Sequence, residues 1–227
     1  MKILSVLFFL SFASFAGGTA NAATVFNGSM GTAGSVNVQS FNGIQPDDWQ
    51  DIGLSSSTDL FDATTSFNGF TWAESSDGGT FVHALGPINS IPGEGIIQEI
   101  TGLTIGVTYA IDFEQSISRS TNPGQSAGGH WEVVFGGETE SSDYMVNPAL
   151  GVAYGWENQS LLFIATAQSQ DLSFQAVPAV SGDRLGLGLD GVSISTVTVS
   201  PVPVPAAVWL FGSGLALLGW IRRKPAA

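Results

Sequence analysis

The stretch VTYAIDFE, residues 107–114, alternates apolar and polar side chains along its length. In an extended chain, successive side chains point to opposite faces. One face is apolar and carries Val107, Tyr109, Ile111 and Phe113. The other face is polar and carries Thr108, Asp112 and Glu114. This pattern predicts a β-strand whose apolar face is buried in a core.

Two other segments repeat the alternation and predict strands of the same core. Their apolar faces are formed by Trp131, Val133 and Phe135, and by Leu172, Phe174 and Ala176. Further candidate strands are residues 24–29, 69–73, 80–84, 95–100, 160–165 and 191–199. Turn residues separate these runs, and we find no helical period between them. Roughly eight to ten strands at this spacing predict an all-β fold, a two-sheet jelly-roll sandwich.

The two ends of the chain have the pattern of export and membrane segments. Residues 1–22 combine a basic start, an apolar run and the small-residue site Ala20-Asn21-Ala22, which predicts a signal peptide cut by signal peptidase before Ala23. Residues 202–221 carry no charge, and we expect a transmembrane helix over about 204–221. The basic residues that follow predict that residues 23–199 lie outside the cytoplasm and the tail inside.

Composition narrows the classes of partner. Residues 23–199 contain two arginines, Arg119 and Arg184, against all 19 acidic residues, so this region carries a formal charge of −17. Such a surface disfavours nucleic acid and anionic lipid. The chain has no cysteine, which excludes disulfides and leaves its stability to a packed core.

The last segment, residues 200–227, resembles a PEP-CTERM sorting signal of the V-P-x-P-A variant. The matching positions are Val202, Pro203, Pro205 and Ala206, then the apolar run, then Arg222, Arg223 and Lys224. Val204 stands where the family's name has glutamate. The resemblance implies recognition by an exosortase, a membrane-embedded cysteine transpeptidase that removes the tail, and release to the cell surface or matrix. The alternative interpretation is a plain membrane anchor of a structural or adhesive protein.

Residues 23–199 resemble galactose-binding-like jelly rolls, among them carbohydrate-binding modules. Residues 27–30 are similar to the opening strand of those domains, residues 97–109 to their central hairpin, and residues 189–194 to their closing strand. The resemblance implies a structural calcium ion between the first and last strands, with Asp190 as one ligand. Gly31 stands where a second acidic ligand is expected. The alternative role for Asp190 is to cap a turn before its strand.

Three tryptophans are candidates for sugar binding. Flat aromatic rings cover the apolar face of a pyranose, while polar side chains bind its hydroxyl groups. Trp49, Trp72 and Trp156 have polar neighbours, whereas Trp131 is in phase with the core. The alternative for each of the three is packing at the base of a loop.

Catalytic patterns are weaker than binding patterns. His83 and His130 are the only histidines, and neither a zinc-binding HExxH motif nor a serine-hydrolase GxSxG motif occurs. Glu114, Glu132 and Asp112 lie on polar faces of strands expected to be neighbours, where a carboxylate pair would suit a glycosidase. We therefore predict an exported, non-enzymatic protein that associates with extracellular polysaccharide, with a surface glycoside-active enzyme as the alternative.

Overall fold

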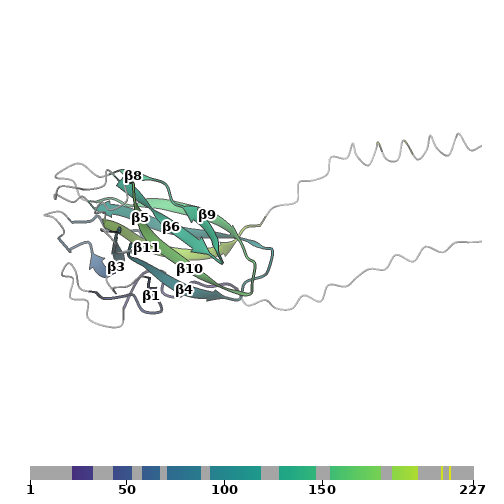
Figure 1. The fold of residues 1–227 in the computed structure, drawn as a ribbon, viewed down its shortest axis with the longest axis horizontal. Helices are drawn as coiled ribbons and strands as arrows, with labels where there is room; N and C mark the ends of the chain where they lie inside the picture. The colour runs from purple at the N-terminus through teal and green to yellow at the C-terminus, as the bar shows by residue number, and fades with distance from the viewer. Residues whose placement is uncertain are drawn as a thin grey trace, which may run out of the picture. The chain divides into compact units, whose positions relative to one another are not determined.

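The computed structural model describes residues 22–32, 43–52, 58–66, 71–87, 93–118, 128–146, 154–179, 186–198, 211 and 215. Their strands form two antiparallel sheets (Figure 1). The six-stranded sheet has the order β1 (Gln50–Asp51), β4 (Gly95–Thr101), β10 (Ser169–Pro178), β6 (Gly128–Phe135) and β7 (Glu138–Ser141), with β8 (Met145–Val146) also paired to β6. The five-stranded sheet has the order β2 (Asp59–Asp62), β3 (Thr80–Leu85), β11 (Gly186–Thr196), β5 (Thr108–Ser118) and β9 (Glu157–Ile164). The predicted all-β, two-sheet sandwich is confirmed.

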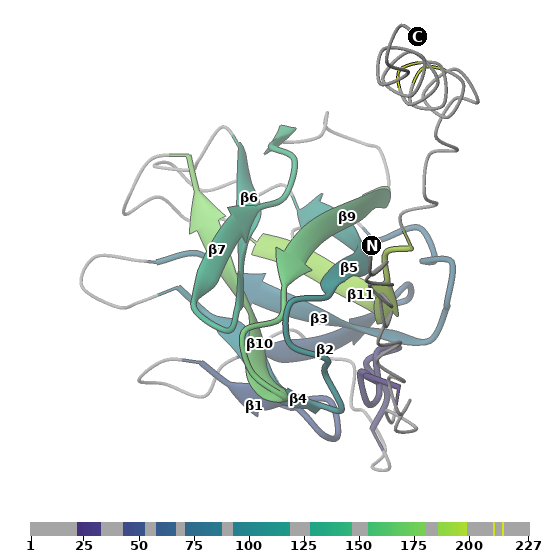
Figure 2. The same ribbon diagram turned by 90° about the vertical axis from the view of Figure 1, so that its right-hand side faces the viewer.

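The core lies between the two sheets, which face one another in Figure 2. Each of the three predicted apolar faces is buried there. The Phe174 ring, from β10, lies 5.1 Å from Phe113 of β5 and 6.3 Å from Trp131 of β6, both edge to face. Burying one large apolar side chain contributes about 1.5–3 kcal/mol, so these facing strands carry much of the stability.

Two expected strands differ in the structure. Residues 24–29 were predicted to be a strand and instead form a loop with a turn, because Asn27 and Met30 have positive φ angles (49° and 51°) that an extended strand excludes. In the candidate 69–73, Trp72 makes only an isolated bridge to Tyr154, and residues 69–70 lie outside the described ranges.

The closing strand is displaced from its predicted bounds. β11 begins at Gly186, five residues before the expected start at 191, because Leu187 and Leu189 extend its buried face. Its pairing with β5 is interrupted by a bulge between Asp190 and Ser193. Gly191 sits in that bulge with a φ of 61°, a conformation that glycine adopts without strain.

A second apolar cluster lies on the outer face of the five-stranded sheet. It consists of Phe61, Trp72, Phe81 and Tyr154, with Trp156 packed against it. The fully buried His83 ring stacks on Phe61 at 4.4 Å, and burial lowers its pKa to about 3. His83 is therefore neutral, and part of this outer face is as dry as the inner one.

The chain divides into two compact units, Met1–Val197 and Thr198–Ala227. In the second unit only Phe211 and Leu215 are described after Thr198; both are helical and exposed. No helix among the described residues has the length and hydrophobicity needed to cross a membrane. The predicted signal peptide (apart from Ala22), the two arginines of residues 23–199 and the sorting positions lie outside the described residues; these positions are Val202, Pro203, Pro205, Ala206, Arg222, Arg223 and Lys224.

Candidate functional site

Polar side chains gather on the outer face of the five-stranded sheet, next to the outer apolar cluster. The strand register places Asp190 of β11 opposite Glu114 of β5, and Glu114 opposite Asn158 of β9. Asp112 lies two residues before Glu114 on the same face and is opposite Ser160 of β9. The polar face predicted for residues 107–114 therefore extends over three neighbouring strands.

A cavity of about 360 Å³ lies over these strands, and we call it the β5–β9 cavity. Its lining includes the polar residues Asp77, Asp112, Glu114, Asn158 and Ser160, of which the four on strands have their side chains on this outer face. Carboxylates accept hydrogen bonds, amides both accept and donate, and the serine hydroxyl does either. The cavity is thus equipped to bind a ligand that presents several hydroxyl groups.

The segment 73–79 forms one wall of this cavity and is fastened to the sheet by two carboxylates. The Ser75 hydroxyl donates a short hydrogen bond to Asp190 Oδ2, and the Ser76 N–H donates to Glu114 Oε2 at 2.7 Å. The Gly78 N–H in turn donates to Ser75 Oγ at 3.2 Å. Asp190 of β11 and Glu114 of β5 therefore hold segment 73–79 in position over the sheet.

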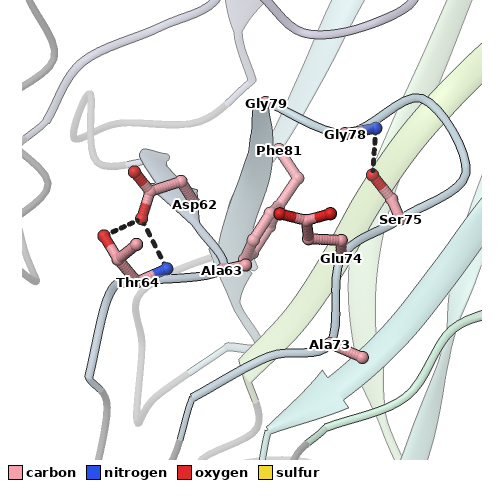
Figure 3. A pocket seen from close by; sticks show the side chains of 9 residues that line it. All are labelled: Asp62, Ala63, Thr64, Ala73, Glu74, Ser75, Gly78, Gly79 and Phe81. Atoms are coloured by element: carbon pink, nitrogen blue, oxygen red, sulfur yellow. Dashed lines mark hydrogen bonds between the residues drawn. The ribbon is translucent and has the colours of Figure 1, made fainter.

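A smaller cavity of about 180 Å³ lies on the other side of the same segment (Figure 3), and we call it the β2–β3 cavity. Figure 3 shows the Glu74 carboxylate in front of the Phe81 ring, with Asp62 across from it. Asp62 Oδ1 already accepts hydrogen bonds from the N–H and the hydroxyl of Thr64, at 2.8 and 2.7 Å. Because the segment carries Ser75 into one cavity and Asp77 into the other, it separates the two.

Acidic side chains dominate the electrostatics of this region among the described residues. Asp190 is fully buried, and its loss of solvent raises the pKa of its carboxyl to about 6, with the nearby charges of Asp77 and Glu114 adding to the effect. Its hydrogen bonds with Ser75 and Gly191 act in the opposite direction and are too weak to offset burial. The ranges that the structure describes contain no lysine or arginine to neutralise these groups.

Two of the three tryptophan candidates are core residues, which corrects the prediction that their rings form a ligand platform. Trp49 is buried between the sheets, where its Nε1–H donates to the Asn27 carbonyl at 3.1 Å. Trp72 is buried in the outer cluster, with its ring 4.7 Å from Tyr154. Neither presents a ring face to solvent, because polar sequence neighbours do not reveal which distant segments pack over an indole.

Trp156 is placed differently. It is half-buried, its Nε1–H donates to the Ala73 carbonyl at 2.8 Å, and its ring meets Phe81 edge to face at 5.0 Å. It thus lies where segment 73–79 begins, two residues before Asn158 of the β5–β9 cavity. Its role in ligand binding stays a prediction.

Tyr144, which sequence reasoning missed, is an exposed aromatic residue in the segment that bonds β9 from the other sheet. Its side chain is 48% exposed. The N–H of the preceding residue, Asp143, donates to Gln159 Oε1 at 2.9 Å, and the strand register places the Gln159 side chain on the inner face of β9, opposite to Asn158 and Ser160. Tyr144 ends the polar run SSDY, and this polar context could have marked it as an exposed aromatic residue. The local sequence does not show that this run contacts β9.

The implied calcium site does not fit the residues present. Both oxygens of Asp190 are engaged, Oδ1 by the Gly191 N–H at 2.8 Å and Oδ2 by Ser75. At Gly31, where the resemblance places an acid, the backbone N–H and carbonyl bond to the Asn27 side chain instead. Among the described residues, no three acidic, histidine or cysteine side chains come together as a metal site would need. Asp190 lies within β11 and supports the bulge and segment 73–79.

The alternative of a glycosidase could have used Glu114 together with Glu132, but the structure does not bring these two residues together. Glu114 is on the outer face of the five-stranded sheet, whereas Glu132 of β6 lies between the inward-facing Trp131 and Val133 on the outer face of the other sheet. The two carboxylates are therefore on opposite sides of the sandwich. Asp112 and Glu114 remain as a pair on one strand, with Cα atoms about 7 Å apart.

Comparisons with known proteins give only distant structural likenesses. No protein-family model matches the chain, and a search of the curated proteins finds no match. Among solved structures, the chain is similar to a sugar-binding EclA C-terminal domain, with 19% identity, 44% of this chain and 64% of that chain covered, and a TM-score of 0.31.

It is also similar to a CBM4 module, with 17% identity, 67% and 97% coverage and a TM-score of 0.39. The third is the CBM22-1–GH10 part of Clostridium thermocellum xylanase 10B, with 14% identity, 74% and 29% coverage and a TM-score of 0.41.

Proposed function

We propose that the protein binds extracellular polysaccharide through the β5–β9 cavity. The observation that carries this proposal is the set of carboxylate, amide and hydroxyl side chains that two strands, β5 and β9, and segment 73–79 present to one cavity. A sugar ring presents hydroxyl groups that both donate and accept, and such groups match this lining. The half-buried Trp156, two residues before Asn158, is the aromatic residue proposed to border it.

The proposed activity is binding without cleavage. The lining of the β5–β9 cavity contains no histidine, and Glu114 is committed to holding Ser76. The second candidate, a glycoside-active enzyme, is favoured by the Asp112–Glu114 spacing, because glycosidases use two carboxyl groups roughly 5 to 10 Å apart. The two candidates differ in whether new reducing ends appear.

We also propose that the protein is exported and that an exosortase removes residues after the Pro-rich segment near 200–205, which releases the β-sandwich to the cell surface or matrix. The support is the sequence pattern alone. Mass spectrometry of the protein from the native host tests it, because processing removes Arg222, Arg223 and Lys224. An intact tail in hosts with and without exosortase would instead support a plain membrane anchor.

The binding proposal is tested with the full-length protein against a panel of insoluble and soluble polysaccharides. We expect retention by at least one polysaccharide without new reducing ends. The double variant Asp112→Asn, Asn158→Ala should lose most of that retention, because it changes groups on two strands of the cavity. Glu132→Gln on the other sheet is the matched control and should bind like the wild type. Equal binding by the double variant and the wild type, or no binding of the wild type to any polysaccharide, would refute the proposal. Cleavage of a polysaccharide by the wild type that is lost in Asp112→Asn would instead establish the enzyme.

A further inference from the structure

The Asn27 side chain fastens three separate groups near the start of the sandwich. Its Nδ2 donates to the Gly31 carbonyl at 2.7 Å and to the Asp47 carbonyl at 2.6 Å. Its Oδ1 accepts from the Gly31 N–H at 2.9 Å. The two donated bonds use both hydrogens of one amide, and they bring together carbonyls that are 16 residues apart in the sequence.

The backbone around Asn27 connects this fastening to the rest of the domain. The Asn27 carbonyl accepts from Trp49 Nε1–H, and the Val192 N–H of β11 donates to the Gly28 carbonyl at 2.9 Å. The positive φ of Asn27 is one that asparagine tolerates better than most residues. The opening segment therefore meets the 43–49 loop at the Asn27 side chain and the closing strand at the Gly28 backbone.

We infer that the Asn27 carboxamide serves here in place of a calcium ion, so that the junction of the opening segment and the 43–49 loop is held without metal. Carbonyl oxygens such as those of Gly31 and Asp47 are ordinary calcium ligands. Here both carbonyls accept hydrogen bonds from Asn27 Nδ2, whose partly positive hydrogens take the place of a cation's charge, and the Gly31 carbonyl also accepts from the Asp47 N–H at 3.0 Å. The acid that the resemblance places at position 31 is unnecessary, because Asn27 bonds the Gly31 backbone on both sides.

A single substitution at Asn27 should make the stability of this junction depend on calcium. Asn27→Asp replaces the donating nitrogen with an oxygen, so the carboxylate faces the Gly31 and Asp47 carbonyls without a hydrogen between them. Thr32 Oγ1 and Asp47 Oδ1, 3.3 Å apart, are further oxygens on the residues that adjoin this site. We expect these oxygens to repel one another in the variant until a calcium ion binds between them.

The test is thermal unfolding of the full-length protein in EDTA and in millimolar calcium, the concentration range in which extracellular modules bind this ion. The wild-type Tm should be the same in both. In EDTA, Asn27→Asp should lower Tm by roughly 5 to 10 °C, and calcium should restore at least half of that loss. Gln168→Glu, an amide-to-acid change at an exposed side chain, is the matched control and should respond in neither condition.

Three outcomes would overturn the inference. The first is a wild-type Tm that calcium raises or EDTA lowers, which needs no variant to be observed. The second is an Asn27→Asp protein that is as stable as the wild type in EDTA, because the amide hydrogens would then hold nothing together. The third is a destabilised Asn27→Asp protein that calcium does not restore, because the carbonyls would then not be placed as ligands.

Discussion

The two faces of β5 are both largely buried, but by different means. On the inner face, Tyr109, Ile111 and Phe113 pack against the opposite sheet. On the outer face, Glu114 is buried beneath segment 73–79, which hydrogen bonds hold in place. The inner face is stabilised by the burial of apolar surface. The outer face buries carboxyl groups, and removing these groups from water costs free energy. The inner face can therefore serve only stability, while the outer face keeps polar groups in position for a ligand.

The largest expected effect is on the inner face. Phe174→Ala should lower the free energy of unfolding by about 3–5 kcal/mol, because it leaves a cavity beside both the Phe113 and the Trp131 rings, which contact Phe174. Urea unfolding followed by tryptophan fluorescence measures it. A loss under about 1 kcal/mol would show that the inner face is not the main source of stability.

The next effect is the pH dependence caused by Asp190 on the outer face. Its pKa in the folded protein, about 6, lies above its ordinary value of 3.8. Between these values the folded state binds more protons than the unfolded state, so stability falls as pH rises through this window, by up to about 3 kcal/mol.

Asp190→Asn should remove this part of the slope, because its amide keeps an acceptor for the Gly191 N–H and carries no charge. Unfolding in urea at pH 4 and pH 7, compared between wild type and variant, isolates the Asp190 contribution from that of the other acids. Equal slopes in the two proteins would show that the fold does not hold this carboxyl in a costly charged state.

A smaller effect is expected where segment 73–79 is fastened. Ser75→Ala removes the hydroxyl that bonds Asp190 and should cost about 2 kcal/mol, since the lost hydrogen bond is to a carboxylate. Amide hydrogen exchange should rise at residues 76–79 and stay unchanged in β10. Uniform acceleration over both regions would mean that Ser75 acts on the whole domain.

The smallest effect is expected at Trp156. Trp156→Phe keeps an aromatic ring against Phe81 and loses the hydrogen bond to the Ala73 carbonyl, so we expect a loss of about 1 kcal/mol. Because the indole is proposed to border the site, the free energy of polysaccharide binding should fall by more than the free energy of unfolding does. Unaltered affinity would remove Trp156 from the site.

The same contrast between the faces explains what the sequence could predict. The alternation in residues 107–114 determined which side chains of β5 face the core, because that pattern is local. It did not reveal that Glu114 is covered, since Ser76 is 38 residues away. Pairing Glu114 with Glu132 failed because sheet membership depends on long-range pairing: β6 follows β5 in the chain and lies in the other sheet.

Trp49 and Trp72 were misjudged for the same reason. Their neighbours in the sequence are polar, and the segments that cover them are distant. The Asn27 carbonyl that receives the Trp49 N–H is 22 residues away, and the Tyr154 ring that packs on Trp72 comes from the segment before β9. The positive φ angles of Asn27 and Met30 likewise cannot be recognised from the alternation of apolar and polar side chains. Residues 24–29 were therefore predicted to be a strand.

The most direct test of the proposed role of the outer face is an NMR titration of the full-length, isotope-labelled protein with soluble fragments of the polysaccharides in the panel. We predict shifts that saturate and cluster at Asp77, Asp112, Asn158 and Gln159, with none at Glu132 or Gln175 on the other sheet. Shifts confined to the six-stranded sheet, or no saturable shifts with any fragment, would contradict the account.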